Sequence, residues 1–257
     1  MSYQVVFFDI DFTLVNKEKE IPQDTIEAID KLKKSGIIVA IATGRPPYMF
    51  HPIAKKLGIE TFVSINGSLV IHKGKVIHRH IFEKEALAEL EEQAAKNGHA
   101  LSYFAREGSF SNQPEHPYIL ECFKELKYPP PAYHPAAWKE FDIFQALVYC
   151  TQQEEHLYQP LEAFRFVRWH EYSMDGIPHG SSKAKGIEVL LDQLGIDRSK
   201  AVAFGDGLND REMLSYVGMG VAMGNAHEEL KAHADFITNS VDNGGIAYGL
   251  QYLNLIK

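Results

Sequence analysis

The sequence predicts an α/β fold: a doubly wound, Rossmann-like parallel-sheet core that is interrupted by an inserted α+β segment. In the first third of the chain, short apolar runs alternate with stretches of helical period, and the same alternation returns after Gly180. Between about residues 83 and 175 the chain is instead richer in aromatic residues and prolines. Alternating strands and helices are typical of βαβ units around a parallel sheet, so the middle segment is interpreted as an insertion into one sheet domain.

The first third is expected to supply three buried strands, two helices and a hairpin. We expect the strands at residues 4–8, 37–43 and 61–65, and the helices at 22–36 and 46–58. Pro22 lies near the start of the first helix and Gly36 at its end, which are usual start and stop signals. Residues 68–81 are interpreted as a hairpin that turns at Lys73 and Gly74.

The middle segment is expected to form a separate module. A charged amphipathic helix at 84–98 precedes candidate strands at 100–104, 144–150 and 165–172. The core is therefore assigned to residues 1–82 and 179–257, and the cap to residues 83–178. A hinge is expected near 81–84 and 174–180, because Gly176, Pro178 and Gly180 cluster in the second of these segments.

The last third returns to the alternation of strands and helices. The pattern predicts strands at 201–205, 220–223 and 236–239, and helices at 183–195, 209–218, 226–234 and from about Gly245. These elements are expected to extend the sheet that the first third begins.

Composition and charge exclude several classes of protein. The formal net charge is −8 and no basic run carries interleaved aromatic residues, so nucleic acid is not an expected partner. The apolar runs are far shorter than a membrane-spanning helix, and the first residues carry neither a basic leader nor a cleavage signal, so neither membrane insertion nor secretion is expected. Cys122 and Cys150 are the only cysteines, which predicts a reducing, cytoplasmic setting without disulfides.

Polar residues follow the predicted strands at their carboxyl ends, which is where ligands of open α/β sheets bind. Lys183 opens the first helix after the insertion. Four carboxylates, one lysine and a hydroxyl are therefore expected to meet in one crevice. The residues at the strand ends are Asp9, Asp11, Thr13, Thr43, Gly44, Arg45, Asp206, Asn209 and Asp210.

A cluster of four carboxylates predicts a bound cation. Without one the carboxylates would repel each other, and burial would force some of them to take up protons. No Cys or His lies beside them in the sequence, and a set of oxygen donors favours Mg²⁺ over Zn²⁺. Mg²⁺ that is held by one or two carboxylates commonly completes its coordination with water and phosphate oxygens. The crevice is therefore predicted to bind a phosphorylated ligand.

This arrangement predicts phosphoryl-transfer chemistry. Asp9 can attack a phosphoryl group to give an aspartyl-phosphate, and Asp11 can protonate the leaving oxygen and later deprotonate water. Lys183 and Thr43 would stabilise charge on the phosphoryl oxygens. Each residue alone has an ordinary interpretation, such as a turn former, a helix cap or a solvated lysine. Their shared placement at strand ends and helix starts favours catalysis.

Four segments match, in order, the motifs of the haloacid dehalogenase (HAD) superfamily of phosphatases: DIDFT, ATGR, PHGSSKAKG around Lys183, and GDGLND. The segments INGS, VAMGNA and ADFITNSVDNGGIA resemble the Cof-type branch, in which a large α+β cap lies between the second and third motifs. The resemblance covers residues 1–82 and about 179–257. The inserted segment matches by position and length more than by residues.

The resemblance implies a role for each matching position. It implies Asp9 as nucleophile and metal ligand, Asp11 as acid/base with its backbone carbonyl on Mg²⁺, and Asp206 as a further metal ligand. It also implies contacts to phosphate for Thr43, Gly44, Lys183 and Asn209, support of the metal site or of Lys183 by Asp210, and a substrate contact for Arg45.

Phe12 departs from the family pattern, because family members usually have glycine at this position. A backbone torsion open only to glycine is therefore not expected here. Phe12 is expected to reshape the cleft entrance or to pack beneath it.

The predicted function is Mg²⁺-dependent hydrolysis of a small phosphorylated metabolite: a sugar phosphate, a nucleotide or a phosphorylated cofactor. One alternative is a phosphomutase, which returns the phosphoryl group to a sugar. The other is a non-catalytic sensor of a phospholigand or Mg²⁺, although binding alone needs no acid/base carboxylate such as Asp11. The choice of substrate is expected to lie with cap residues, which carry no readable motif.

Overall fold

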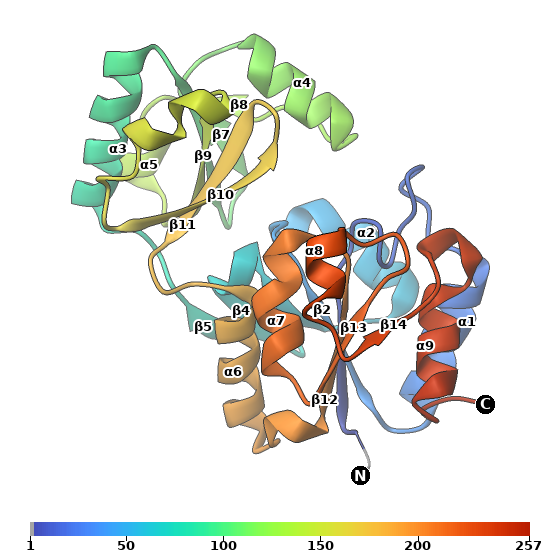
Figure 1. Cartoon of the computed structure of the whole chain (residues 1–257). Helices are drawn as coiled ribbons and strands as arrows, with labels where there is room; N and C mark the ends of the chain where they lie inside the picture. Colours follow the sequence, from blue (N-terminus) through green and yellow to red (C-terminus); the bar gives the residue numbers. More distant parts are fainter. Residues whose placement is uncertain (1–2) are drawn as a thin grey trace. The chain divides into compact units, whose positions relative to one another are not determined.

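The computed structural model describes residues 3–257 and divides into two compact units (Figure 1). The first unit contains the chain up to Arg45 together with Phe50–His78 and Ser182–Lys257. The second contains Pro46–Met49 and Arg79–Ser181. That the second unit works as a substrate-selecting cap stays a prediction. No helix within residues 3–257 is both long enough and apolar enough to cross a membrane.

The first unit is built on a sheet with the strand order β14-β13-β12-β1-β2-β3-β4-β5. Its strands are β1 Val5–Phe8, β2 Ile38–Ala42, β3 Thr61–Ser64, β4 Leu69–His72, β5 Lys75–Arg79, β12 Ala201–Gly205, β13 Met219–Ala222 and β14 Phe236–Ile237. Neighbours from β14 to β3 pair in parallel, and β4 pairs antiparallel with β3. The chain order reverses around β1, which confirms the predicted doubly wound α/β fold.

Helices cover both faces of this sheet. On one side α1 Gln23–Lys34 lies beside α9 Gly245–Tyr252, and on the other α6 Lys183–Leu194 lies beside α7 Arg211–Tyr216 (Figure 1). The remaining helices are α2 Pro47–Leu57 and α8 Glu228–Lys231. The latter is shorter than predicted, because the backbone and side chain of Asp235 both hydrogen-bond to Gly220 and turn the chain into β14.

The centre of the sheet explains the run of apolar residues at the start of the chain. Every residue of β1 is buried, since helices cover both faces of a parallel sheet. Phe8 stacks on Phe204 of the neighbouring β12, with ring centroids 5.0 Å apart. A shift in the register of a strand that is packed on both faces would disrupt the packing of every side chain. The strand therefore fixes the position of the residue that follows it. That residue is Asp9.

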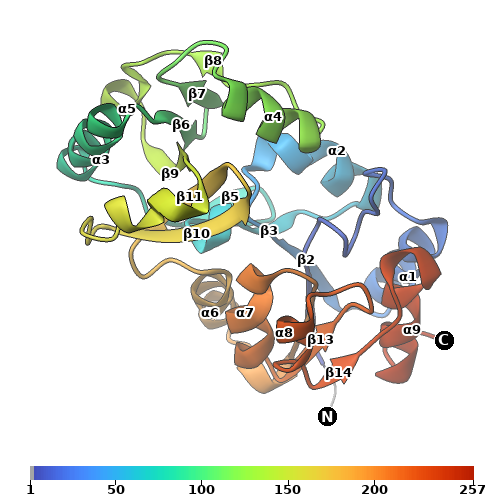
Figure 2. The same ribbon diagram turned by 45° about the horizontal axis from the view of Figure 1, so that its top comes forward.

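The second unit contains a sheet with the order β10-β11-β9-β6-β7-β8. Its strands are β6 Ala100–Ala105, β7 Ser109–Ser111, β8 Ala132–Tyr133, β9 Ile143–Tyr149, β10 Phe164–His170 and β11 Ser173–Pro178, and its helices are α3 Lys84–Asn97, α4 Pro117–Glu125 and α5 Ala137–Glu140. Helix α3 packs with Val148 and α4 with Leu147 and Tyr149. Because neighbouring strand residues point to opposite faces, the two helices cover opposite faces of this sheet (Figure 2).

Strand β11 corrects part of the expected hinge. Residues 174–178 belong to the segment expected to form a hinge, but all five pair with β10, and residues 174–176 also pair with β9. Glycine suits close packing inside this strand, since a Cβ on Gly176 would lie 3.0 Å from the ring of Phe166 and 3.2 Å from that of Phe164. The glycine therefore marks close packing rather than a break in the strand.

Candidate active site

Three predicted site residues lie at one edge of the first sheet. Asp9 follows β1, Thr43 follows β2 and Asp206 follows β12. These three strands are neighbours and run in parallel, so their carboxyl ends share an edge. The backbone N–H of Asp9 donates to the carbonyl of Phe204 (3.0 Å) and that of Thr43 to the carbonyl of Val63 (2.8 Å), which continues the sheet bonding into the site.

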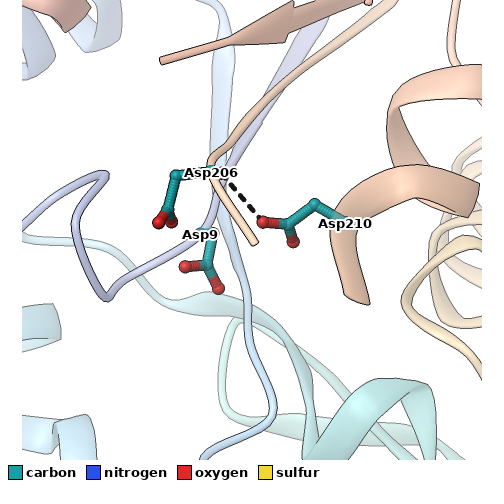
Figure 3. A group of neighbouring side chains, drawn as sticks. All are labelled: Asp9, Asp206 and Asp210. Atoms are coloured by element: carbon teal, nitrogen blue, oxygen red, sulfur yellow. Dashed lines mark hydrogen bonds between the residues drawn. The ribbon is translucent and has the colours of Figure 1, made fainter. Parts of the chain in front are cut away.

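The carboxylates of Asp9, Asp206 and Asp210 form the centre of the site (Figure 3). Each offers an oxygen, and these oxygens all lie within 4.8 Å of one another. Burial raises the pKa of Asp9 to about 7, with repulsion from Asp210 and Asp11 acting in the same direction and Lys183 opposing it. Burial, followed by repulsion from Asp9 and Asp210, raises the pKa of Asp206 to about 9.

The close spacing of three carboxylates fits a hard divalent cation. The ionised form of Asp9 and Asp206 is costly in the protein alone, and a cation between oxygen donors would remove that cost. Thr13 donates from its hydroxyl to Asp206 Oδ1 (3.2 Å), which leaves the second oxygen of that carboxylate for a ligand. The donor set is oxygen only, which favours Mg²⁺ among common metals.

Asp210 has a different environment from its two neighbours. Its Oδ1 accepts a hydrogen bond from Lys183, and its Oδ2 accepts from the backbone N–H groups of Asp206 and Gly207, each at 3.0 Å. The residue is fully buried, and a Cβ on Gly205 would lie 2.6 Å from its carboxyl carbon. Its bonding capacity is thus largely used within the protein, so Asp210 holds the loop that carries Asp206.

Lys183 forms hydrogen bonds to both Asp9 and Asp210. Its Nζ donates to Asp9 Oδ1 and to Asp210 Oδ1, both at 2.6 Å, and the side chain is 1% exposed. Burial favours the neutral amine, but the two carboxylates outweigh it and raise the pKa of Lys183 above its ordinary value. The lysine is therefore a fixed positive charge beside Asp9.

Two glycines let helix α6 approach closely enough for Lys183 to reach this position. Gly67 has φ +88°, and a Cβ there would lie 2.0 Å from the carbonyl oxygen of Ser182. A Cβ on Gly186 would lie 2.5 Å from a methyl carbon of Val63 and 2.8 Å from the Cα of Gly67. The first turn of α6 thus rests directly on the backbone of the INGS turn.

Asp11 is not a member of the carboxylate cluster and pairs instead with two cations. Arg45 donates from Nε to Asp11 Oδ2 (2.8 Å) and from Nη2 to Oδ1 (2.6 Å), and Lys19 Nζ donates to Oδ1 (2.7 Å). Burial acts to raise the pKa of Asp11, but Arg45 and then Lys19 outweigh it and hold the pKa below its ordinary value. Arg45, predicted as a substrate contact, here binds Asp11.

Sequence reasoning missed Lys19. The residue lies in a turn in which Asn16 N donates to Glu20 O (2.9 Å) and Lys19 N donates to Asn16 O (3.0 Å). No periodicity or motif marks such a contact, because it depends on how the turn folds back onto Asp11.

Phe12 contradicts one expectation. Its φ is +53°, so the backbone adopts a left-handed torsion that favours glycine although a bulky residue occupies the position. The backbone N–H groups of Thr13, Leu14 and Val15 all donate to the carbonyl of Ile10, and this tight turn imposes the torsion. The ring is 41% exposed, and Lys19 Nζ lies 5.3 Å from its centroid.

The predicted phosphate-binding residues differ in burial and in their contacts within the site. Thr43 is buried, and its Oγ1 accepts a hydrogen bond from the backbone N–H of Arg45 (3.2 Å). Gly44 lies against Asn66, whose amide would be 3.2 Å from an added Cβ. Asn209 is exposed on the 3₁₀ turn Leu208–Asp210, and within residues 3–257 no hydrogen bond joins its side chain to the other predicted site residues.

The family model of the haloacid dehalogenase-like hydrolases matches residues 6–250. The chain belongs to this family. It is 41% identical over 257 residues to the putative phosphatase YkrA of Bacillus subtilis, and the match covers all of both chains. The resemblance that the four motifs indicated is therefore confirmed, and the protein is a hydrolase of the phosphatase type.

Two solved structures show the same architecture. The HAD phosphatase BT1666 of Bacteroides thetaiotaomicron is 30% identical, with a TM-score of 0.92 and a match over 99% of this chain and 96% of that one. The HAD subclass IIB sugar phosphatase BT4131 is 27% identical, with a TM-score of 0.90 over 98% of this chain and 100% of that one. This HAD protein therefore shares its whole fold, including the inserted segment, with known phosphatases.

Proposed function

We propose that the protein is a Mg²⁺-dependent phosphatase that hydrolyses a small phosphorylated metabolite through an aspartyl-phosphate on Asp9. The observation that supports this most directly is the position of the Asp9 carboxylate at the end of the central strand, beside Asp206 and bonded to the buried Lys183. Asp9 and Asp206, with the backbone carbonyl of Asp11, would hold the metal ion. When bound, the ion would offset the negative charge of the carboxylates and of the phosphate.

The other site residues would bind the phosphate, transfer protons and position the catalytic groups. Lys183 would bind a phosphoryl oxygen, and Thr43, Gly44 and Asn209 would complete the phosphate site with hydroxyl, backbone and amide groups. Asp11 would protonate the leaving oxygen and then activate water. Its carboxylate is ionised in the ligand-free geometry, and the negative charge of an arriving phosphate would favour its protonation. Asp210 would keep Lys183 and the loop at Asp206 in place.

The proposal is tested by phosphate release from p-nitrophenyl phosphate, with Mg²⁺ and with EDTA. Asp9→Asn should keep the fold and lower turnover by about a thousandfold or more, because the amide cannot act as the nucleophile. Asp30→Asn on the exposed face of α1 is the matched control and should retain wild-type activity. Turnover by Asp9→Asn near the wild-type rate would exclude the nucleophile assignment.

The substrate class is tested with a panel of phosphorylated metabolites. Sugar phosphates come first in this panel, because the similar BT4131 is a sugar phosphatase, and nucleotides and phosphorylated cofactors follow. We expect free phosphate from at least one sugar phosphate. An isomerised sugar phosphate without free phosphate would instead identify a phosphomutase.

A further inference from the structure

We propose that Asn66 is a positioning residue of the phosphate site, because the turn that carries it holds both the Thr43–Gly44 peptide and the start of helix α6. The inference rests on the proposed function, since it explains how groups assigned to the phosphate are held and adds none that touches the phosphate. The turn is Ile65–Gly67, which follows β3 at the carboxyl edge of the first sheet. The INGS motif alone assigns no role to Asn66.

The backbone of this turn is unusual. Ile65, Asn66 and Gly67 have φ of +51°, +49° and +88°, so three successive residues have positive φ. Left-handed torsions normally occur at single residues, and a β-branched residue such as isoleucine is a clear outlier there. Such conformations persist only where the surrounding structure holds them, and they cluster at functional sites. The contacts of the turn identify what it holds in return.

The first contacts fix the loop that follows β2. Asn66 N donates to the carbonyl of Thr43 (3.0 Å). The backbone N–H of Ile65 (3.3 Å) and the hydroxyl of Ser64 (2.8 Å) both donate to the carbonyl of Arg45. The turn therefore holds this loop at two of its carbonyl groups.

The hydrogen bond from Asn66 orients a backbone donor. The Thr43–Gly44 peptide is trans, so its carbonyl and its N–H point in opposite directions. Because the carbonyl points at Asn66 N, the N–H of Gly44 points away from the turn. Within residues 3–257 this N–H donates to no protein group, and it is the backbone donor that we assign to the phosphate. Asn66 therefore sets the direction of this donor.

The side chain of Asn66 restrains the same loop by packing. The residue is 5% exposed, and its amide nitrogen and oxygen both lie 3.2 Å from the position of a Cβ on Gly44. The amide therefore packs against the backbone of Gly44 and limits how far the loop can shift. Asparagine also suits the torsion, since it is among the residues most often found at positive φ. Alanine would lose both properties, whereas glycine would lose only the amide.

The last residue of the turn contacts the start of α6. A Cβ on Gly67 would lie 2.0 Å from the carbonyl oxygen of Ser182, which is the N-cap of the helix. Ser182 immediately precedes Lys183, whose Nζ is the buried cation of the site. The backbone N–H of Ser68 closes the turn by donating to the carbonyl of Ile65 (3.0 Å). A shift of the turn would therefore move the lysine as well as the backbone donor.

The test measures how tightly the folded protein binds inorganic phosphate, as a competitive inhibitor of p-nitrophenyl phosphate hydrolysis with Mg²⁺. Asn66→Ala should raise the inhibition constant about tenfold and lower kcat/KM by about the same factor, because a misdirected donor loses a charge-assisted hydrogen bond. Asn66→Gly can adopt the torsion and should raise the inhibition constant about threefold. The glycine variant decides the test if the alanine variant does not fold.

Asn254 provides the matched control. It is an exposed asparagine with φ +56° that follows α9. Asn254→Ala and Asn254→Gly repeat the two substitutions at a positive φ outside the site. Both should keep the inhibition constant and kcat/KM within about twofold of wild type, because a purely structural role does not change phosphate binding by the folded protein.

The outcomes separate this inference from the proposed function. If wild type releases phosphate while the folded Asn66 variants keep inhibition constants within about twofold of wild type, the role of Asn66 is wrong and the proposed function stands. The same conclusion follows if Asn254→Ala raises the constant as much as Asn66→Ala does. If wild type releases no phosphate from p-nitrophenyl phosphate or from any ester of the metabolite panel, the proposed function fails and this inference fails with it.

Discussion

Phe12 shows that a bulky residue can occupy a left-handed backbone position that favours glycine. Its φ of +53° lies in a region where a Cβ costs energy, and the hydrogen bonds of the turn after Ile10 hold it there. The sequence suggested that phenylalanine would exclude this torsion. The structure shows instead that phenylalanine adopts this torsion at the cost of backbone strain.

This strain predicts an unusual order of stabilities at position 12. Phe12→Gly should be more stable than Phe12→Ala by about 1 kcal/mol, because glycine adopts the left-handed torsion without steric cost. Urea unfolding of the two variants measures the difference. Glu27, exposed on helix α1, is the control, since there alanine should be more stable than glycine by about the same amount. Equal stability of the two Phe12 variants would show that the torsion is unstrained.

At the level of residues, the sequence predicted some of the site and could not predict the rest. Asp9 and Asp206 follow apolar strands directly, so the strand-end rule places them on one edge, and the structure brings them together with Asp210 and Lys183. The contact between Lys19 and Asp11 was not predictable, because it joins residues of one irregular loop whose course depends on turn hydrogen bonds.

Among the elements, α6 has the most direct effect on the site. Its residue Gly186 contacts Val63 and Gly67 without space for a side chain, and its first residue is Lys183. The depth at which the helix docks therefore sets the reach of the lysine. A displacement of about 1 Å at a positioned catalytic group can cost up to about a hundredfold in rate.

Gly186→Ala should therefore affect stability and activity together. The added Cβ would lie 2.5 Å from Val63 and 2.8 Å from Gly67 Cα, so the helix must move or the core must strain. We expect a loss of about 1–3 kcal/mol in unfolding free energy and a fall of about tenfold or more in kcat/KM.

Gly195→Ala is the matched control at the other end of α6. Its φ of +64° makes alanine unfavourable by about 1 kcal/mol, but nothing lies within 4 Å of the added Cβ. This variant should lose stability and keep its activity. An active Gly186→Ala enzyme with the same loss of stability would show that helix depth does not govern the site.

Elements with strong local patterns were predictable, and those that depend on tertiary contacts were not. Strand β1 is a continuous apolar run and α3 has a clear helical period that ends at Gly98, so both were predicted within a residue or two. Strand β11 was missed, because Gly176 and Pro178 resemble a loop in sequence and only the rings of β10 explain the glycine. The two-residue strand β8 has too few residues for any pattern.

For the molecule as a whole, the carboxylate cluster couples folding to pH. In the unfolded chain Asp9 and Asp206 lose their protons near the ordinary pKa of 3.8. In the folded protein the pKa of Asp9 is raised to about 7 and that of Asp206 to about 9. Between these limits the folded state binds more protons than the unfolded state. Its stability therefore falls as pH rises across this window, and it is highest at the acidic end as far as these two groups are concerned.

Magnesium should reverse this loss if it occupies the proposed site, because the ion would bind the ionised carboxylates. We expect the thermal unfolding midpoint of the EDTA-treated protein to fall from about pH 5 to about pH 8, and the increase in midpoint on adding Mg²⁺ to grow over the same range. Asp206→Asn removes one of the two titrating groups and isolates their effect from the rest of the protein. Without metal it should be more stable than wild type at about pH 8, and it should gain less from Mg²⁺. A Mg²⁺ effect that is independent of pH in wild type, or unchanged in Asp206→Asn, would mean that these carboxylates are not the metal site.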